Sequence, residues 1–149
     1  MSVSFRSGFP QTTEGAVRDF EAAVGFRLPE DYREFLLKDN GGQQPEPDCF
    51  RVETGEITAV SVLFPIGKSG DYYDLSAHFE YQKDELPRGV IPIGKDIGGN
   101  TICLALDGEE RGSVLFMEHE AETGPHEEGW DNLYFCARSF TEFLDGLRD

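Results

Sequence analysis

The sequence predicts an α+β fold, in which about four helices pack on a mostly antiparallel β-sheet of about five or six strands. Two helical patterns lie near the N-terminus and one lies at the C-terminus. Between them, short stretches of alternating apolar and polar residues are separated by glycine-containing turns. Because short turns join antiparallel neighbours, the sheet is expected to be mostly antiparallel. We expect residues 1–149 to form a single domain.

The first helix is expected at 12–24. Thr12 or Thr13 can cap its N-terminus, and Gly25 can end it in the left-handed conformation that glycine tolerates. Residues 1–11 are expected to form a loose or extended lead-in. The predicted core face of this helix consists of Ala16, Val17, Phe20, Ala23 and Val24.

The second helix has both of its ends marked in the sequence. Pro29 suits the first helical position, and Glu30 and Asp31 place negative charge at the positive end of the helix dipole. Asn40 and Gly41 then stop the helix, because both residue types accept the left-handed conformation. The predicted buried stripe consists of Tyr32, Phe35 and Leu36. The short connection predicts that the two helices pack side by side.

The middle of the chain changes from helical spacing to alternation. Strands are expected at 50–54 and 57–64, joined by a tight turn. Ser69 or Asp71 is then expected to cap a third helix. The predicted core face of that helix consists of Tyr72, Leu75 and Phe79.

The C-terminal half is expected to hold the remaining strands. A strand at 90–93 is placed at an edge or an end of the sheet, because Pro92 lacks a backbone donor. A glycine-rich loop at 94–100 follows. The next strand, 101–106, directs Ile102, Leu104 and Leu106 to one face, and a hairpin turn leads to the returning strand at 113–119.

The last segment begins with a long polar loop at 120–131 and a short strand at 133–137. Ser139 and Glu142 have the spacing of a capping box, which starts the final helix. The residues of this helix that are expected to face the core are Phe140, Phe143, Leu144 and Leu147.

Charge is the dominant feature of the composition. Thirteen Lys and Arg residues stand against 29 Asp and Glu, for a formal net charge of -16. The cations are scattered, which argues against binding to nucleic acid or to an anionic membrane. The chain has no apolar run of membrane-spanning length and no leader-like start, so we expect a cytoplasmic protein. The charge fits either general solubility or a surface built for a strongly basic partner.

The sequence offers little support for catalysis, a metal or a cofactor. Cys49, Cys103 and Cys136 share no metal-type spacing and are expected to be reduced. The glycine-rich turn at 98–100 lacks the Lys and Ser or Thr of a phosphate-binding loop, and a structural turn is expected there. His78 is expected to be partly exposed on the third helix.

His119 is the remaining candidate for a metal or an acidic catalytic site. Four neighbours could join it, but their spacing matches no defined site, and a solvated acidic loop is the favoured interpretation. These neighbours are Glu118, Glu120, Glu122 and His126.

A set of ordered motifs resembles the SUKH superfamily, named after fungal cell-wall regulators of the Smi/Knr type. The first motif covers the second helix and its stop: Leu28, Pro29, Asp31, Tyr32, Phe35, Leu36, Asn40, Gly41 and Gly42. Three further motifs follow in the order of the family: Gly98, Gly99, Asn100, Ile102, Cys103 and Leu104; Gly112, Val114, Glu118, His119 and Glu120; and Ser139, Phe140, Phe143 and Leu144.

The chain departs from the family pattern at two places. Ala105 stands where the family commonly has Asp, and Met117 and Glu118 stand where it has Trp-Asp. The resemblance implies a non-enzymatic, bacterial immunity-type protein that neutralises a toxin delivered between competing cells. A regulatory or adaptor module without a toxin partner, like the fungal relatives, is the alternative.

Because nuclease clefts are basic, the net charge of -16 points to a nuclease as the toxin. Two acidic surfaces are the candidates for binding it, each with aromatic residues among its carboxylates. The 71–85 segment carries Asp71, Tyr72, Tyr73, Asp74, Glu80, Tyr81, Asp84 and Glu85. The 118–131 segment carries Glu118, Glu120, Glu122, Glu127, Glu128, Trp130 and Asp131. The other interpretation is that Tyr72 and Trp130 belong to the core and the acids are solvated.

Overall fold

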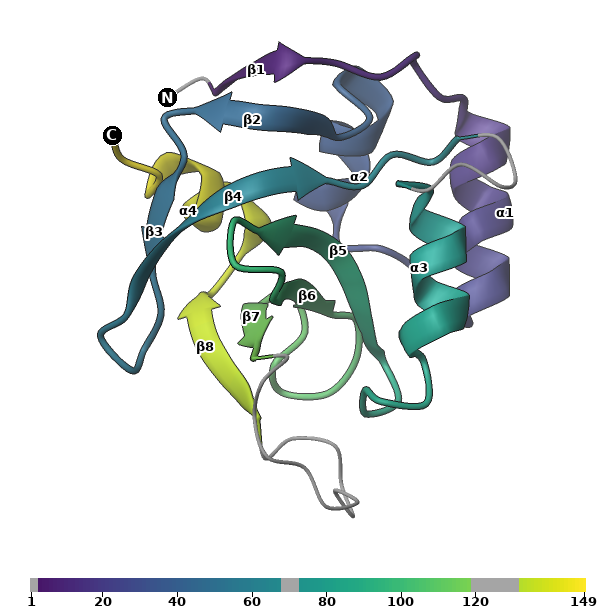
Figure 1. Ribbon diagram of the computed structural model, residues 1–149. Helices are drawn as coiled ribbons and strands as arrows, with labels where there is room; N and C mark the ends of the chain where they lie inside the picture. Colours follow the sequence, from purple (N-terminus) through teal and green to yellow (C-terminus); the bar gives the residue numbers. More distant parts are fainter. Residues whose placement is uncertain (1–2, 68–72, 119–131) are drawn as a thin grey trace.

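A computed structural model describes residues 3–67, 73–118 and 132–149 of the chain (Figure 1). Its elements are β1 (Ser4–Ser7), α1 (Glu14–Val24), α2 (Glu30–Lys38), β2 (Gly42–Glu46), β3 (Cys49–Arg51), β4 (Ile57–Leu63), α3 (Leu75–Gln82), β5 (Val90–Asp96), β6 (Thr101–Ala105), β7 (Val114–Met117), β8 (Leu133–Ala137) and α4 (Phe140–Asp145). The predicted α+β class with four helices is confirmed for this described part. The predicted number of strands was too low, because the sheet formed by the described residues has eight.

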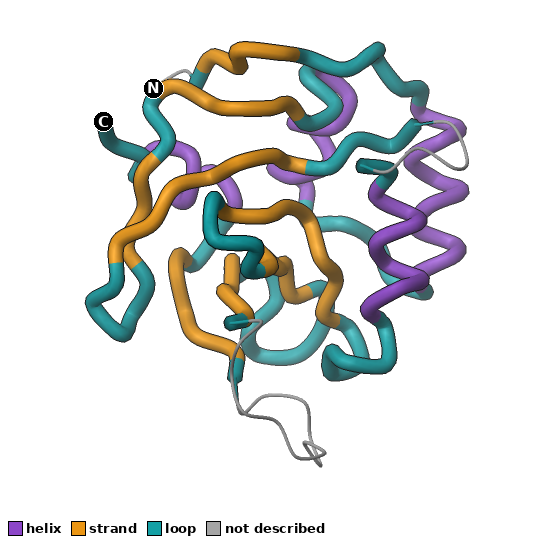
Figure 2. The backbone as a smooth tube through the Cα atoms, in the orientation of Figure 1, coloured by secondary structure: helices purple, strands orange, loops and turns teal. Residues whose placement is uncertain are grey.

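The strands form one antiparallel sheet in the order β1-β2-β4-β5-β6-β7-β8, and β3 pairs with β4 beside this path. The sheet curves so that β8 approaches the hairpin between β3 and β4 (Figure 2). Glu53 in that hairpin joins the two: its backbone N–H donates to the Phe135 carbonyl at 2.9 Å, and the Phe135 N–H donates to the Glu53 carboxylate. Edge strands expose unpaired backbone groups. At the edge of β8, Glu53 binds both the carbonyl and the N–H of Phe135.

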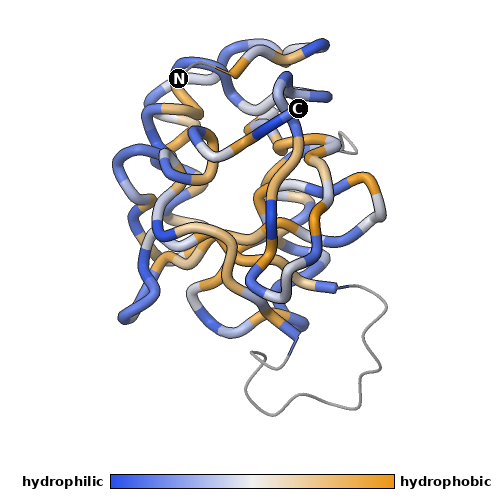
Figure 3. Tube along the Cα trace, turned by 90° about the vertical axis from the view of Figure 1, so that its left-hand side faces the viewer, coloured by the Kyte–Doolittle hydropathy of each residue, from blue (hydrophilic) through white to orange (hydrophobic). Residues whose placement is uncertain are grey.

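The main core lies between the sheet and the helices. Phe50 of β3 contacts Phe116 of β7 and Phe143 of α4, with ring centroids 6.0 and 5.1 Å apart. As predicted, Ile102, Leu104 and Leu106 join this core. A smaller cluster on the other face of β5–β8 buries Leu86, Val90, Cys103, Ala105, Leu115 and Met117. Apolar residues lie mainly along the strands and helices around the core, and most of the outer turns are hydrophilic (Figure 3).

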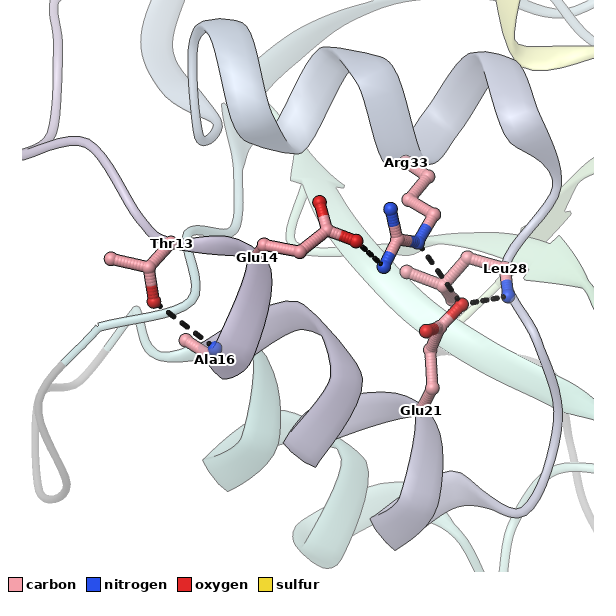
Figure 4. A network of polar contacts seen from close by, with 6 residues as sticks. All are labelled: Thr13, Glu14, Ala16, Glu21, Leu28 and Arg33. Carbon is pink, nitrogen blue, oxygen red and sulfur yellow. Dashed lines mark hydrogen bonds and ion pairs between the residues drawn. The ribbon is translucent and has the colours of Figure 1, made fainter.

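The two N-terminal helices are joined by a polar contact that the sequence did not reveal (Figure 4). Arg33 of α2 is buried and forms an ion pair with Glu14 at the start of α1. Its Nε also lies 3.5 Å from Glu21 Oε2, within charge attraction but without the alignment of a hydrogen bond. Glu21 Oε2 in turn accepts the Leu28 N–H at 2.9 Å. Glu21 therefore orients the connection between the helices.

The predicted ends of α1 are confirmed. Thr13 Oγ1 accepts the Ala16 N–H at 3.1 Å, and Gly25 has φ 86°. The start of α2 is shifted by one residue, because Pro29 has extended ψ 143° and acts as the N-cap. In the last helix, α4, the Ser139 Oγ accepts the Glu142 N–H at 3.0 Å, as the predicted capping box requires.

Two strands were missed near the N-terminus. The predicted lead-in contains β1, and the segment after α2 contains β2 despite Pro45. These short, polar strands pair with each other, with Phe5 opposite Pro45. Because β4 pairs only with Gly42 and Gln43 of β2, the missing donor of Pro45 is not needed there.

The prediction that the Pro92 strand lies at an edge or an end is wrong. β5 continues to Asp96 and lies between β4 and β6, so the predicted loop at 94–100 is reduced to 97–100. Pairing with β4 begins at Gly94, beyond Pro92, and the register with β6 shifts between these two residues. An irregular ladder thus accommodates the proline inside the sheet.

The predicted cap of α3 is also wrong. Asp74 caps the helix, its Oδ2 accepting the Ala77 N–H at 3.3 Å. Ser69, Asp71 and Tyr72 lie outside the described residues. Leu75 is buried as predicted and Phe79 packs at the border of the core, where it contacts Phe20 of α1.

Candidate partner-binding surface

The described residues include part of each acidic surface that the sequence indicated. Asp71, Tyr72, Glu120, Glu122, Glu127, Glu128, Trp130 and Asp131 lie outside them, as do His119 and His126. The described candidates are Tyr73, Asp74, Glu80, Asp84, Glu85 and Glu118.

Two of these residues lie where they support the fold. Asp74 is only 5% exposed, and besides capping α3 its Oδ1 accepts the Gly67 N–H at 2.9 Å. Tyr73 is half-buried and packs edge-on against Phe9, with ring centroids 6.1 Å apart. Asp74 therefore contributes little to the outer surface of this segment.

Three of the remaining four candidates are exposed, and they lie near an exposed tyrosine in the sequence. Glu80, Asp84 and Glu85 lie along the end of α3 and the turn that continues it, and Tyr81 between them is 82% exposed. We refer to Glu80, Tyr81, Asp84 and Glu85 as the α3 surface. A tyrosine exposed among carboxylates combines the residue type enriched in binding hot spots with a strong local charge.

Lys83 is the cation within this stretch, and it is already paired. Its Nζ lies 2.9 Å from Glu80 Oε2, and this contact raises the pKa of Lys83 above its ordinary value. The pair is exposed, so it contributes little to stability. The remaining carboxylates leave the α3 surface net negative.

A groove of about 410 Å³ lies next to the α3 surface. Phe26, Phe79 and Leu86 supply apolar walls, and Lys83 and Asp84 form part of its rim. Arg88 closes another side, with its guanidinium 5.4 Å from the centre of the Phe26 ring. The groove therefore offers apolar area beside the acidic residues.

Glu118 belongs to a contact that sequence spacing could not predict. The pKa of Glu56, an exposed residue in the β3–β4 hairpin, is raised by partial loss of solvent and then by the nearby Glu118 carboxyl. The two glutamates are far apart in sequence, and only the curvature of the sheet brings them together. This pair extends the negative charge of the described chain to the β3–β4 hairpin.

The glycine-rich turn is structural, as the sequence predicted. Its amides are occupied by a carboxylate of the chain itself: Asp96 Oδ1 accepts the N–H groups of Gly98 and Asn100 at 3.0 and 2.7 Å. Asp96 Oδ2 accepts the Thr58 hydroxyl at 2.8 Å. An external anion would have to displace this buried carboxylate, so the turn is not an anion site.

Other candidate chemistry also belongs to the core. Burial raises the pKa of Cys136 to about 12 and raises that of Cys103 further, so neither thiol is a ready nucleophile. The expectation for His78 was wrong: the ring is buried and stacks on Phe64 at 3.8 Å. Within the described ranges, no group of metal-ligating side chains is assembled and no helix is long and apolar enough to span a membrane.

Comparison with known proteins identifies the family. The sequence model of the SMI1/KNR4 family (SUKH-1) matches residues 11–146. The chain belongs to the SMI1/KNR4 family. The chain is also 29% identical to the SPbeta prophage-derived uncharacterized protein YokK of Bacillus subtilis (strain 168), over 153 aligned positions that cover 92% of this chain and 75% of the relative. The resemblance found in the sequence is confirmed.

The family motif around α2 consists of residues that hold the fold together. Asn40 has φ 52°, is 1% exposed, and binds the backbone of Pro10 and Ile66. Asp31 links α2 to α4 by accepting the N–H and the hydroxyl of Thr141 at 2.9 and 3.0 Å. These SUKH-1 motif residues therefore define the framework, and the α3 surface lies outside the motif.

Proposed function

We propose that this SMI1/KNR4-family chain is a non-enzymatic immunity-type protein that binds and neutralises a basic protein toxin. The observation that carries the proposal is the α3 surface, where Tyr81 is 82% exposed among Glu80, Asp84 and Glu85. A basic partner would cover the ring and neutralise the carboxylates together. The 118–131 segment is a second proposed contact on the same reasoning.

The chemistry of the proposed toxin follows from the charge. A nuclease needs a cationic cleft to hold phosphates, and a protein of net charge -16 can occupy such a cleft in place of the nucleic acid. The family and the α3 surface support a protein partner, and the charge supports a nuclease. We place this interaction in the cytoplasm, where the toxin would act.

The test is protection of cells together with recovery of the complex. Toxin candidates encoded beside this gene are expressed with and without the chain, and each is tagged for co-purification. The proposal expects survival only when the chain is present, and a stoichiometric complex with the protective candidate. Normal survival without the chain, or no complex with any adjacent candidate, would contradict the immunity function and favour an adaptor role.

Variants then locate the contact. Tyr81→Ser combined with Asp84→Asn and Glu85→Gln should weaken the complex at least about tenfold, since hot-spot residues carry most of the binding energy. The matched control is Glu109→Gln with Glu110→Gln, exposed acids on the β6–β7 turn. If both sets weaken the complex equally, overall charge and not the α3 surface determines binding.

A further inference from the structure

A second groove lies on the opposite side of the molecule from the α3 surface. It has a volume of about 250 Å³ and lies between α2, α4 and β1. Figure 1 shows α4 at the left of the molecule and α3 at its right. A contact in this groove is therefore separate from one on the α3 surface.

The floor of the groove is apolar and mostly aromatic. Phe35 of α2 packs against Phe140 of α4, with ring centroids 4.8 Å apart, and against Phe5 of β1 at 6.0 Å. Phe5 and Leu144 are only half-buried, so part of this floor remains in contact with solvent. Phe5 can lie this close to β2 because Gly42 has no side chain, since a Cβ there would overlap the ring.

The rim of the groove carries negative charge. Asp31, Glu34, Asp39 and Asp145 line it, and Lys38 is the one cation among its lining residues, all of them described. A segment that enters the groove therefore contacts an apolar floor whose surrounding residues carry a net negative charge. Charge complementarity selects lysine or arginine on either side of the entering group.

The two helices that form the groove are fixed relative to each other. The Asp31 carboxylate accepts both the backbone N–H and the hydroxyl of Thr141, which joins the first turn of α2 to the first turn of α4. A site that is already shaped loses little conformational freedom on binding. Binding therefore does not require the ligand to order α2 and α4.

We propose that this groove binds a basic protein segment through one aliphatic side chain flanked by lysine or arginine. The aliphatic side chain lies on Phe5, Phe35 and Leu144, and the flanking cations approach Glu34 and Asp39. This interaction surface goes beyond the proposed function, because it needs neither a toxin nor the α3 surface. A second copy of the same chain is a poor occupant, because both copies carry a charge of -16.

The test uses three synthetic peptides and the full chain. The peptides are KKLKK, the equally charged KKGKK, and EELEE, which keeps the leucine and reverses the charge. Amide chemical shifts are followed by NMR as each peptide is added. The proposal expects KKLKK to shift the amide signals of β1, α2 and α4. KKLKK should bind about fivefold more tightly than KKGKK, because the leucine becomes partly buried. EELEE should leave the spectrum unchanged.

Variants decide between the groove and diffuse attraction. Glu34→Gln with Asp39→Asn should weaken KKLKK binding at least about threefold, and Glu80→Gln with Asp84→Asn on the other side should leave it unchanged. Leu144→Ala should abolish the preference for KKLKK over KKGKK, with the spectrum confirming that the variant is folded. Equal binding of KKLKK and KKGKK, or shifts centred on α3, would overturn the proposal.

Discussion

Single residues of the family motif act through backbone groups that are distant in the sequence. Asn40 Nδ2 donates to the carbonyls of Pro10 and Ile66 at 2.9 and 2.8 Å, and its Oδ1 accepts the Ile66 N–H at 2.8 Å. Asn40 therefore joins the segment before α1, the end of α2 and the segment after β4. Its left-handed backbone directs the side chain into this junction.

Asn40→Ala should lower the free energy of unfolding by about 3 kcal/mol, because buried hydrogen bonds contribute about 1 kcal/mol each and alanine tolerates positive φ poorly. Urea denaturation measures the change. Gln44→Ala is the matched control, since Gln44 also has positive φ, at 50°, but is exposed. Its effect should stay below about 1 kcal/mol. Equal losses in the two variants would contradict the role of the Asn40 side chain.

Glu56 gives a pH-dependent prediction at the same scale. Its pKa in the folded chain is raised above the ordinary 4.5 by partial loss of solvent and by Glu118, although the side chain is exposed. Above this raised pKa the ionised Glu56 destabilises the fold, and the destabilisation disappears as the pH falls through the raised value toward 4.5. Because the side chain is exposed, Glu56→Gln should increase the urea midpoint only slightly at pH 7, and it should have no effect below about pH 4.

Glu109→Gln, on the exposed β6–β7 turn, is the control for that measurement, because it removes the same charge without the Glu118 contact. A gain in stability from Glu109→Gln as large as that from Glu56→Gln would show that total charge is responsible. A gain from Glu56→Gln that persists in acid would contradict the assigned pKa shift.

At the scale of elements, helices were easier to predict than strands. The ends of α1 and α4 depend on local contacts of Thr13, Gly25 and Ser139, which the sequence shows directly. β1 and β2 were missed because their polar residues are held by pairing with each other, across the whole of α1 and α2. Pro92 was misleading because the register with β6 shifts between Pro92 and Gly94, and pairing with β4 begins only at Gly94.

The cap of α3 distinguishes structural from surface acids. Asp74→Ala should lower the free energy of unfolding by about 1–2 kcal/mol, the usual effect of losing an N-cap side chain. Asp84→Asn, at the exposed end of the same segment, should leave the unfolding curve within about 0.5 kcal/mol. Thermal and urea unfolding compare the two variants. The reverse order would contradict the assignment of Asp74 to the fold and of Asp84 to the surface.

The contact between β8 and the β3–β4 hairpin, which the curvature of the sheet brings together, gives a prediction at the scale of the whole molecule. In Glu53→Ala the Phe135 amide loses its carboxylate acceptor, and its hydrogen exchange should accelerate at least about tenfold, since a charge-assisted bond contributes about 1.5–3 kcal/mol. Glu53→Gln keeps an acceptor and should show a smaller change. If Phe135 exchanges at the same rate in all three proteins, Glu53 does not hold the edge of β8.

The candidate site was only partly predictable, because the exposure of its residues depends on the fold of the whole molecule. The sequence showed that Glu80, Asp84 and Glu85 lie close to tyrosines, but not that Tyr81 is exposed while Tyr73 packs on Phe9. Exposure depends on which neighbours the fold supplies. The contact between Glu56 and Glu118 was invisible for the same reason, because the curvature of the sheet creates it.

The most direct measurement of the central claim is the association rate with the cognate toxin as a function of salt, by stopped-flow fluorescence. For the native chain the rate should fall at least about tenfold between 20 and 500 mM NaCl, because screening removes electrostatic steering. For Glu80→Gln with Asp84→Asn and Glu85→Gln the rate should start lower and fall less. A rate independent of salt, with the same value for the native and neutralised chains, would contradict binding through the acidic α3 surface.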